Sequence, residues 1–433
     1  MRLHALPLLA VLLSGSASAS GLDAAAGARV AKEARALCMK DGGRLWGTSL
    51  CGPLLLVERS TRKVVANQPD EEGRLSPASG GMYAGELPPE VGIGNTATQW
   101  AGVRWTMLLW PLPEEKEARA RLLAHESWHR VQEGLGLPMN MPGNAHLDTA
   151  DGRWLLQLEW RALSAALKAR GAARREAVED ALLFRSRRRA LFPLAAEEER
   201  ALELNEGLAE YTGVVLSAKS PEAAARQGLE RAASQESFVR SFAYGSGPAY
   251  GVLLDAVAKG WRKGLTPEVD LGERLVTALG LPKVLTDADA VVEAARAYGG
   301  PALREAEEAR ARARAERDAT ARCGLVEGAV LVLPLKAMQL QFDPNRVFPL
   351  GAHGTVYGTL TVSDTWGKLK ADGGALVAPD FRSVRVPAPA PEAASGAELR
   401  GEGWTLSLQP GWKLVPGTRA GDLVVERAEP VAP

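Results

Sequence analysis

The sequence predicts an α+β protein with an N-terminal β-sheet, a helical half and a C-terminal all-β module. Residues from about 43 to 113 form short runs rich in apolar and β-branched side chains, a pattern typical of strands. Residues from about 114 to 322 repeat apolar positions with helical spacing. From 323 to 433 the strand pattern returns, with Gly and Pro between the runs. We therefore expect one domain over 20–322 and a second over 323–433.

The first residues have the layout of a secretory signal peptide. Met1-Arg2 gives a positive start, Leu6–Leu13 a compact apolar run, and Ala17-Ser18-Ala19 a small-residue cleavage site. The apolar run is too short to span a bilayer, which needs about 20 residues. The sequence thus predicts a signal peptide over 1–19, cleaved near Ala19, and an exported protein that is periplasmic or secreted. A short helix over Asp23–Met39 is expected next.

The N-terminal sheet is expected to contain a hairpin and one long strand. Leu54–Glu58 and Lys63–Ala66 flank the four residues Arg59–Arg62, which is hairpin spacing. Thr98–Trp110 is the clearest extended run, and Pro111 ends it because proline lacks the N–H that a sheet ladder needs.

Five longer segments have helical patterns. They are Glu114–Glu133, Trp154–Ala169, Arg174–Leu191, Ala195–Leu216 and Arg304–Arg322. The first carries acids in its first turn and is stopped by glycines. The last alternates acids and bases, which is typical of a solvated helix face.

The C-terminal module is predicted from β-branched runs at Leu325–Leu335 and Gly354–Val362. Val386–Ala397 is rich in Pro and Ala, and we interpret it as a linker or an exposed loop.

The charge balance indicates which partners the protein can bind, and the cysteines indicate whether a disulfide can form. The 433 residues contain 52 Lys plus Arg and 52 Asp plus Glu. This balance argues against a nucleic-acid partner, and we expect no membrane span. Cys38 and Cys51 can form a disulfide in an oxidising compartment, which leaves Cys323 unpaired; three free thiols are the open alternative.

The strongest chemical signal is the H-E-x-x-H sequence His125-Glu126-Ser127-Trp128-His129, which lies inside a predicted helix. Residues four apart lie on one face of a helix, so both imidazoles can bind one zinc ion. Glu126 lies beside the first ligand, where it can act as the general base toward the attacking water. The sequence therefore predicts a zinc hydrolase with Zn²⁺ as its cofactor.

A second motif, Leu204-Asn205-Glu206-Gly207-Leu208-Ala209-Glu210, follows on another predicted helix. With both motifs, residues from about 98 to 255 resemble the gluzincin metallopeptidases, the relatives of thermolysin and membrane alanyl aminopeptidase. The resemblance implies a thermolysin-like zincin catalytic domain. It also implies that Glu206 is the third zinc ligand and that Glu210 orients a zinc-bound histidine; a solvated helix acid is the alternative for Glu210.

The resemblance extends less closely to Tyr244, which precedes an apolar helical run. In gluzincin aminopeptidases a tyrosine at a similar place stabilises the oxyanion, so Tyr244 is a candidate for that role; a packed core tyrosine is the alternative. The lysine that follows in those enzymes is replaced here by Ser246.

The chain departs from the gluzincin pattern in two further ways. His129 and Glu206 are several times farther apart in sequence than is usual, because the helical pair 154–191 lies between them. That insertion offers Glu159 as a rival third ligand. The G-x-M-E-N sequence that binds a substrate amino terminus is absent, which favours an endopeptidase over an aminopeptidase.

His146 is either a cleft residue or, as we favour, a loop histidine bonded to backbone.

These observations predict a zinc metallopeptidase acting on peptides or proteins, in which Thr98–Trp110 takes the place of the edge strand that holds substrate backbone. Two alternatives stay open. One is a non-catalytic binding or assembly protein on a zincin scaffold. The other is a zinc hydrolase that acts on something other than peptides.

Overall fold

The computed structural model describes residues 21–282, 287–390, 396 and 398–428. The chain divides into two compact units, Met1–Glu307 and Glu308–Pro433. Both helices and sheets are present, so the α+β prediction is confirmed. The division falls inside the long helix α11 (Gly300–Arg322), earlier than the expected boundary at 323. The predicted signal peptide, 1–19, lies outside the described residues.

The first unit begins with helix α1 and a mixed six-stranded sheet. Its strands run in the order β3-β4-β2-β1-β6-β5, and only β1 and β6 are parallel neighbours. The strands are β1 (Leu54–Glu58), β2 (Lys63–Ala66), β3 (Ser76–Pro77), β4 (Tyr83–Glu86), β5 (Thr96–Trp100) and β6 (Val103–Trp110). The hairpin predicted over 54–66 is confirmed, with β1 and β2 antiparallel.

The prediction of a single strand over Thr98–Trp110 is wrong. This segment contains most of β5 and all of β6, which are joined by a tight turn at Ala101 and Gly102. Both turn residues have positive φ, 48° and 81°, which matches the twist of two-residue hairpins. One edge of the sheet is therefore β5, and β6 lies one place inside it.

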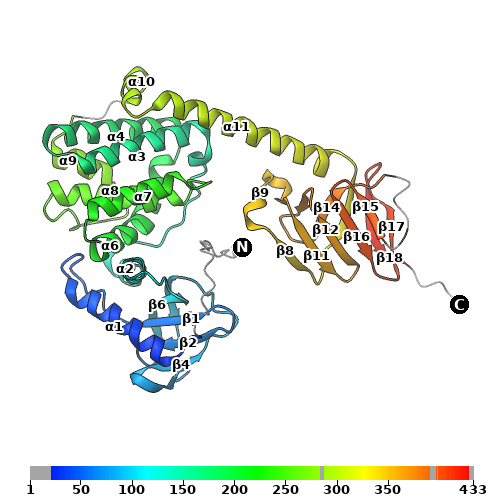
Figure 1. Cartoon of the computed structure of the whole chain (residues 1–433), viewed down its shortest axis with the longest axis horizontal. Helices are drawn as coiled ribbons and strands as arrows, with labels where there is room; N and C mark the ends of the chain where they lie inside the picture. The colour runs from blue at the N-terminus through cyan, green and yellow to red at the C-terminus, as the bar shows by residue number, and fades with distance from the viewer. Residues whose placement is uncertain (1–20, 283–286, 391–395, 397, 429–433) are drawn as a thin grey trace. The chain divides into compact units, whose positions relative to one another are not determined.

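Helices build the rest of the first unit. They are α1 (Ala24–Asp41), α2 (Lys116–Gln132), α3 (Ala150–Lys168), α4 (Gly171–Leu191), α5 (Ala195–Leu202), α6 (Leu208–Ser217), α7 (Pro221–Ala233), α8 (Ser241–Val257), α9 (Leu271–Leu279) and α10 (Ala288–Ala297). Figure 1 shows α2 between the sheet and the layers formed by α3 to α9. The helix predicted over Ala195–Leu216 is interrupted by a π-helical turn, Glu203–Gly207.

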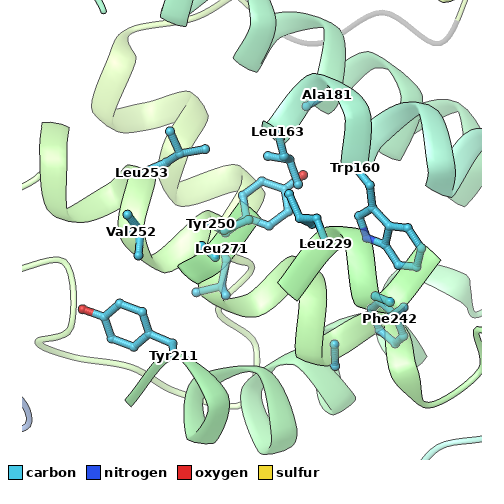
Figure 2. Packing of buried hydrophobic residues seen from close by; sticks show 14 of the residues in the cluster. Trp160, Leu163, Ala181, Tyr211, Leu229, Phe242, Tyr250, Val252, Leu253 and Leu271 are labelled. Carbon is cyan, nitrogen blue, oxygen red and sulfur yellow. The ribbon is translucent and has the colours of Figure 1, made fainter. Parts of the chain in front are cut away.

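A large apolar core holds the helical layers together. Figure 2 shows Trp160 and Leu163 of α3, Leu229 of α7 and Tyr250 of α8 pointing into this core. All four side chains are at most 2% exposed. Burying large aromatic side chains stabilises a core strongly, so the relative positions of α3, α7 and α8 are firmly set.

Cys38 at the end of α1 forms a disulfide with Cys51, just before β1, with the two Cα atoms 5.1 Å apart. The bond closes a loop with a sequence separation of 13, for which chain entropy predicts a stabilisation of about 3 kcal/mol. Cys323 is free and exposed.

Beyond α11, the described part of the second unit consists of strands and short helical turns. The strands are β7 (Val330–Pro334), β8 (Gln339–Phe342), β9 (Val347–Pro349), β10 (Thr355–Tyr357), β11 (Leu360–Asp364), β12 (Gly367–Ala371), β13 (Ala375–Val377), β14 (Ser383–Pro387), β15 (Glu398–Gly401), β16 (Trp404–Leu408), β17 (Trp412–Pro416) and β18 (Leu423–Arg427).

These strands form two sheets, β17-β18-β7-β14-β13-β10-β9 and β15-β16-β12-β11-β8, and side chains from both contribute to one buried cluster. The segment predicted as a linker or an exposed loop, 386–397, begins inside β14, where Val386 is fully buried. Residues 391–395 and 397 of this segment lie outside the described residues. No helix in the described ranges has the length and apolar character that crossing a membrane requires.

Candidate metal centre

Helix α2 presents both histidines of the H-E-x-x-H sequence on its buried face. The helix begins after Glu115, whose carboxylate caps it by accepting hydrogen bonds from the backbone N–H groups of the first turn. Past its last turn, Gly136 adopts a left-handed conformation and ends the helical path. His125, Glu126 and His129 are only 4–6% exposed. The two histidines therefore share one buried face of α2, as the spacing predicts.

Three possible ligand atoms converge at this face. The Nε2 atoms of His125 and His129 lie 3.2 Å apart. Glu206 Oε2 lies 3.4 Å from the first and 3.6 Å from the second. A tetrahedral zinc ion with nitrogen and oxygen ligands at about 2.0–2.2 Å places its ligand atoms about 3.3–3.6 Å apart. Two imidazoles and one carboxylate at these separations fit a zinc ion that keeps a fourth position open.

The charges around the three atoms also favour a cation. Burial disfavours a charge on His125, but hydrogen bonds with Glu206 and Glu210 raise the pKa of its imidazole well above the ordinary value. Burial likewise opposes the charge on Glu206, but the two histidines hold the pKa of its carboxyl far below the ordinary value. The site thus stabilises positive charge in a place from which water is largely excluded.

Glu126 carries an unsatisfied buried oxygen. Its Oε2 atom makes no hydrogen bond to any other described residue. Burial raises the pKa of this carboxyl, although the nearby histidines oppose the rise. A buried polar atom needs a partner, and a water molecule placed for attack would supply one.

The first histidine is oriented by Glu210. His125 Nδ1 lies 2.9 Å from Glu210 Oε2, and Arg121 holds the other carboxylate oxygen. Burial works against the carboxylate, but His125 and Arg121 lower the pKa of Glu210 to about 2. A carboxylate only accepts, so Nδ1 donates to Glu210, and Nε2 is the nitrogen left to bind a metal once its proton is displaced. Glu210 is therefore not a solvated helix acid.

The second histidine is oriented by Gln132, which the sequence analysis missed. His129 Nδ1 lies 2.9 Å from Gln132 Oε1. The Gln132 amide donates to Asn205 Oδ1 at 3.0 Å and to the Pro138 carbonyl at 3.1 Å. Gln132 is fully buried and thereby links the two ligand-bearing helical segments. The signal available in sequence was its spacing, three residues after His129 on one helix face.

Glu206 projects from the π-helical turn Glu203–Gly207. Turns of this kind occur as single bulges, often at functional sites. The turn packs against α8 at a glycine–glycine contact, since a Cβ atom on Gly247 would lie 2.3 Å from the Gly207 Cα. Glycine at both positions lets the two backbones approach closely enough to bring Tyr244 to Glu206.

Tyr244 touches the candidate ligand directly. Its hydroxyl donates to Glu206 Oε2 at 2.6 Å, and its ring stacks on His125 with centroids 5.7 Å apart. Burial and the Glu206 charge raise the pKa of Tyr244 well above its ordinary value, so the hydroxyl keeps its proton. The structure thus gives this hydroxyl a carboxylate partner, and the oxyanion role stays a prediction.

Glu159 and His146 lie in a different cluster. Glu159 is fully buried and bonds to Arg185, Arg188 and the Tyr250 hydroxyl. The structure therefore brings Glu206, and not Glu159, to the two imidazoles. The expectation that His146 bonds to backbone is wrong, because its Nε2 lies 2.8 Å from the Glu199 carboxylate of the same cluster.

Comparison with known proteins gives no further assignment: no protein-family model matches the chain, and neither does any curated protein or solved structure.

Proposed function

We propose that the first unit is a thermolysin-like zincin catalytic domain and that the protein is a zinc-dependent metallopeptidase. The observation that carries the proposal is the meeting of His125, His129 and Glu206 at 3.2–3.6 Å, from two helical segments far apart in the chain. The mixed sheet on one side of α2 and the helical layers on the other agree with such a domain.

His125, His129 and Glu206 would hold the ion. A bound zinc ion polarises a peptide carbonyl and lowers the pKa of water to about 7. Glu126 accepts the proton of the attacking water and delivers it to the leaving amine. Its burial and raised pKa suit a group that both takes and gives a proton.

The remaining residues position these groups. Glu210 and Gln132 fix the ring orientation of His125 and His129 by accepting from Nδ1. Tyr244 donates to Glu206 and can turn its proton toward the developing oxyanion when substrate is bound.

We further propose that peptide substrates bind in an extended form beside the edge strand β5 and are cut internally. An edge strand presents unpaired backbone groups to which an extended peptide can add. Export of the protein is also part of the proposal, and it is supported by the Cys38–Cys51 disulfide, because disulfides persist mainly in oxidising compartments.

The test compares zinc content and peptide hydrolysis in the purified protein and in Glu126→Gln. This variant should keep zinc and lose hydrolysis by at least about a hundredfold, as expected for loss of a general base. Glu117→Gln is the matched control, because Glu117 is an exposed acid on the same helix. Its activity should equal that of the wild type.

Other outcomes decide between the alternatives. If the wild-type protein takes up no zinc, the proposal is contradicted. Zinc-loaded protein that is inert on a broad peptide library favours the binding protein or the hydrolase of other substrates.

A further inference from the structure

The loop that follows α2, residues 136–144, lies against the candidate metal centre. Gln132, which orients His129, donates to the Pro138 carbonyl at 3.1 Å. Asn205, the neighbour of Glu206, donates to the Asn140 carbonyl at 3.2 Å. The loop is therefore fastened to the residues that support two of the proposed ligands.

This loop exposes two methionines. Met139 is 41% and Met141 46% exposed, although both are large apolar side chains. Met141 Sδ lies 3.2 Å from the side-chain amide of Asn205, which precedes Glu206 in the π turn. Met139 Sδ lies 3.9 Å from Arg104 of β6, whose register partner is Gln99 of the edge strand β5. One thioether thus contacts the sheet at β6 and the other contacts the π turn that carries Glu206. Methionine adapts readily to varied apolar partners.

Arg240, a positively charged side chain without a salt bridge in the described part of the chain, lies beside Met141. Arg240 Nη2 is 4.0 Å from Met141 Sδ, and Arg240 precedes Tyr244 by one helical turn. Arg240 forms no salt bridge with any acid among the residues described, whereas Arg104 pairs with Glu133 at 3.0 Å. A guanidinium without a carboxylate partner at this position is complementary to a carboxylate brought by a ligand.

We propose that Met139, Met141 and Arg240 form a substrate subsite that selects peptides in which an apolar side chain lies close to a carboxylate. The apolar side chain covers the thioethers and removes them from water. The carboxylate, from Asp, Glu or a chain terminus, pairs with Arg240. This inference rests on the proposed peptidase function and adds a preference for acidic, apolar segments.

The test uses internally quenched peptides that share one Leu and carry either Asp or Lys at each position within three residues of it. At the best position the wild type should cleave the Asp peptide on the order of tenfold faster in kcat/KM than the Lys peptide. Arg240→Glu should reverse this order, and Arg240→Gln should abolish the preference. Met139→Ser/Met141→Ser should lower kcat/KM for Leu peptides while leaving the Asp-over-Lys ratio intact.

Arg59→Glu is the matched control, because Arg59 is an exposed arginine in the turn between β1 and β2. Zinc content and circular dichroism of each variant verify that the fold is kept. If hydrolysis depends on Glu126 but Arg240→Glu and Arg59→Glu have the same preference as wild type, the subsite is wrong and the peptidase proposal stands. If no peptide is cleaved, both fall together.

Discussion

Gln132 makes three hydrogen bonds, and two replacements separate the bond to His129 from the other two. Its Oε1 accepts from His129 Nδ1, and its Nε2 donates to Asn205 and Pro138. Gln132→Met removes all three hydrogen bonds at nearly constant volume. Gln132→Glu keeps an acceptor for His129 and removes the donors. The pair of variants therefore distinguishes tuning of the metal ligand from general support of the fold.

The magnitudes follow from these contacts. Loss of the partner of a metal-bound histidine typically weakens metal binding by 10- to 100-fold, or about 1.4–2.7 kcal/mol. We expect this loss in Gln132→Met. In Gln132→Glu the carboxylate still accepts from Nδ1, so zinc affinity should stay within about threefold of wild type. Both variants leave the buried Asn205 Oδ1 without this donor, which should lower the free energy of unfolding by about 1–3 kcal/mol. Pro138 is exposed, so water can replace the donor to its carbonyl.

Zinc affinity is measured by competition with a chromophoric chelator, and stability by urea unfolding of the chelator-treated protein. Cobalt substitution adds a spectrum that reports the ligand geometry directly. Equal losses of zinc affinity in the two variants would refute the reasoning, because the contact with His129 would then have no separate effect.

Two further variants and one reagent test other parts of the structure. Gly247→Ala should lower the unfolding free energy by about 1–3 kcal/mol and weaken zinc binding, since its methyl group overlaps the π turn; Gly134→Ala, with open space at its Cβ, is the control. Burial opposes the charge of Glu199, but Arg188 and Arg189 hold its pKa well below the ordinary value. Its stabilisation is therefore present above the unfolded-state pKa of about 4.3 and is lost as pH falls toward the folded-state pKa. Urea unfolding of Glu199→Gln should show a shallower loss of stability with acid, by up to about 1.4 kcal/mol per pH unit. Reduction of the Cys38–Cys51 disulfide with dithiothreitol should lower the unfolding free energy by about 3 kcal/mol, measured by the same method.

Helical periodicity predicted part of the candidate site and could not predict the rest. It placed His125, Glu126 and His129 on one buried face, because that relation is local in the chain. Glu206 was predicted only from a resemblance, since no local rule brings together residues from distant segments. Gln132 was missed because a buried glutamine has no pattern of its own in sequence.

The sequence pattern also did not predict two backbone irregularities, the π turn at 203–207 and the tight turn at Ala101 and Gly102. A π turn differs from an α-helix by one residue per turn and leaves the apolar spacing of 195–216 almost unchanged, so one continuous helix was predicted. The strand error at 98–110 arose because Ala101 adopts a positive φ, a conformation in which alanine is rare. Ala101 therefore gave no turn signal within the apolar run 98–110.

Helices α3 and α4 are inserted between the two segments that carry the proposed zinc ligands, and α4 holds the turn that carries Glu206. Arg185 of α4 donates to both carboxylate oxygens of Glu203, the first residue of the π turn that carries Glu206. Buried ion pairs contribute little net stability because desolvation offsets their attraction, but they can specify one arrangement. We infer that this pair fixes the π turn and hence the position of Glu206. Arg185→Lys keeps the charge and loses the two-pronged geometry. It should weaken zinc binding by about tenfold. If a folded Arg185→Lys protein binds zinc as tightly as the wild type, the Arg185–Glu203 pair does not position Glu206.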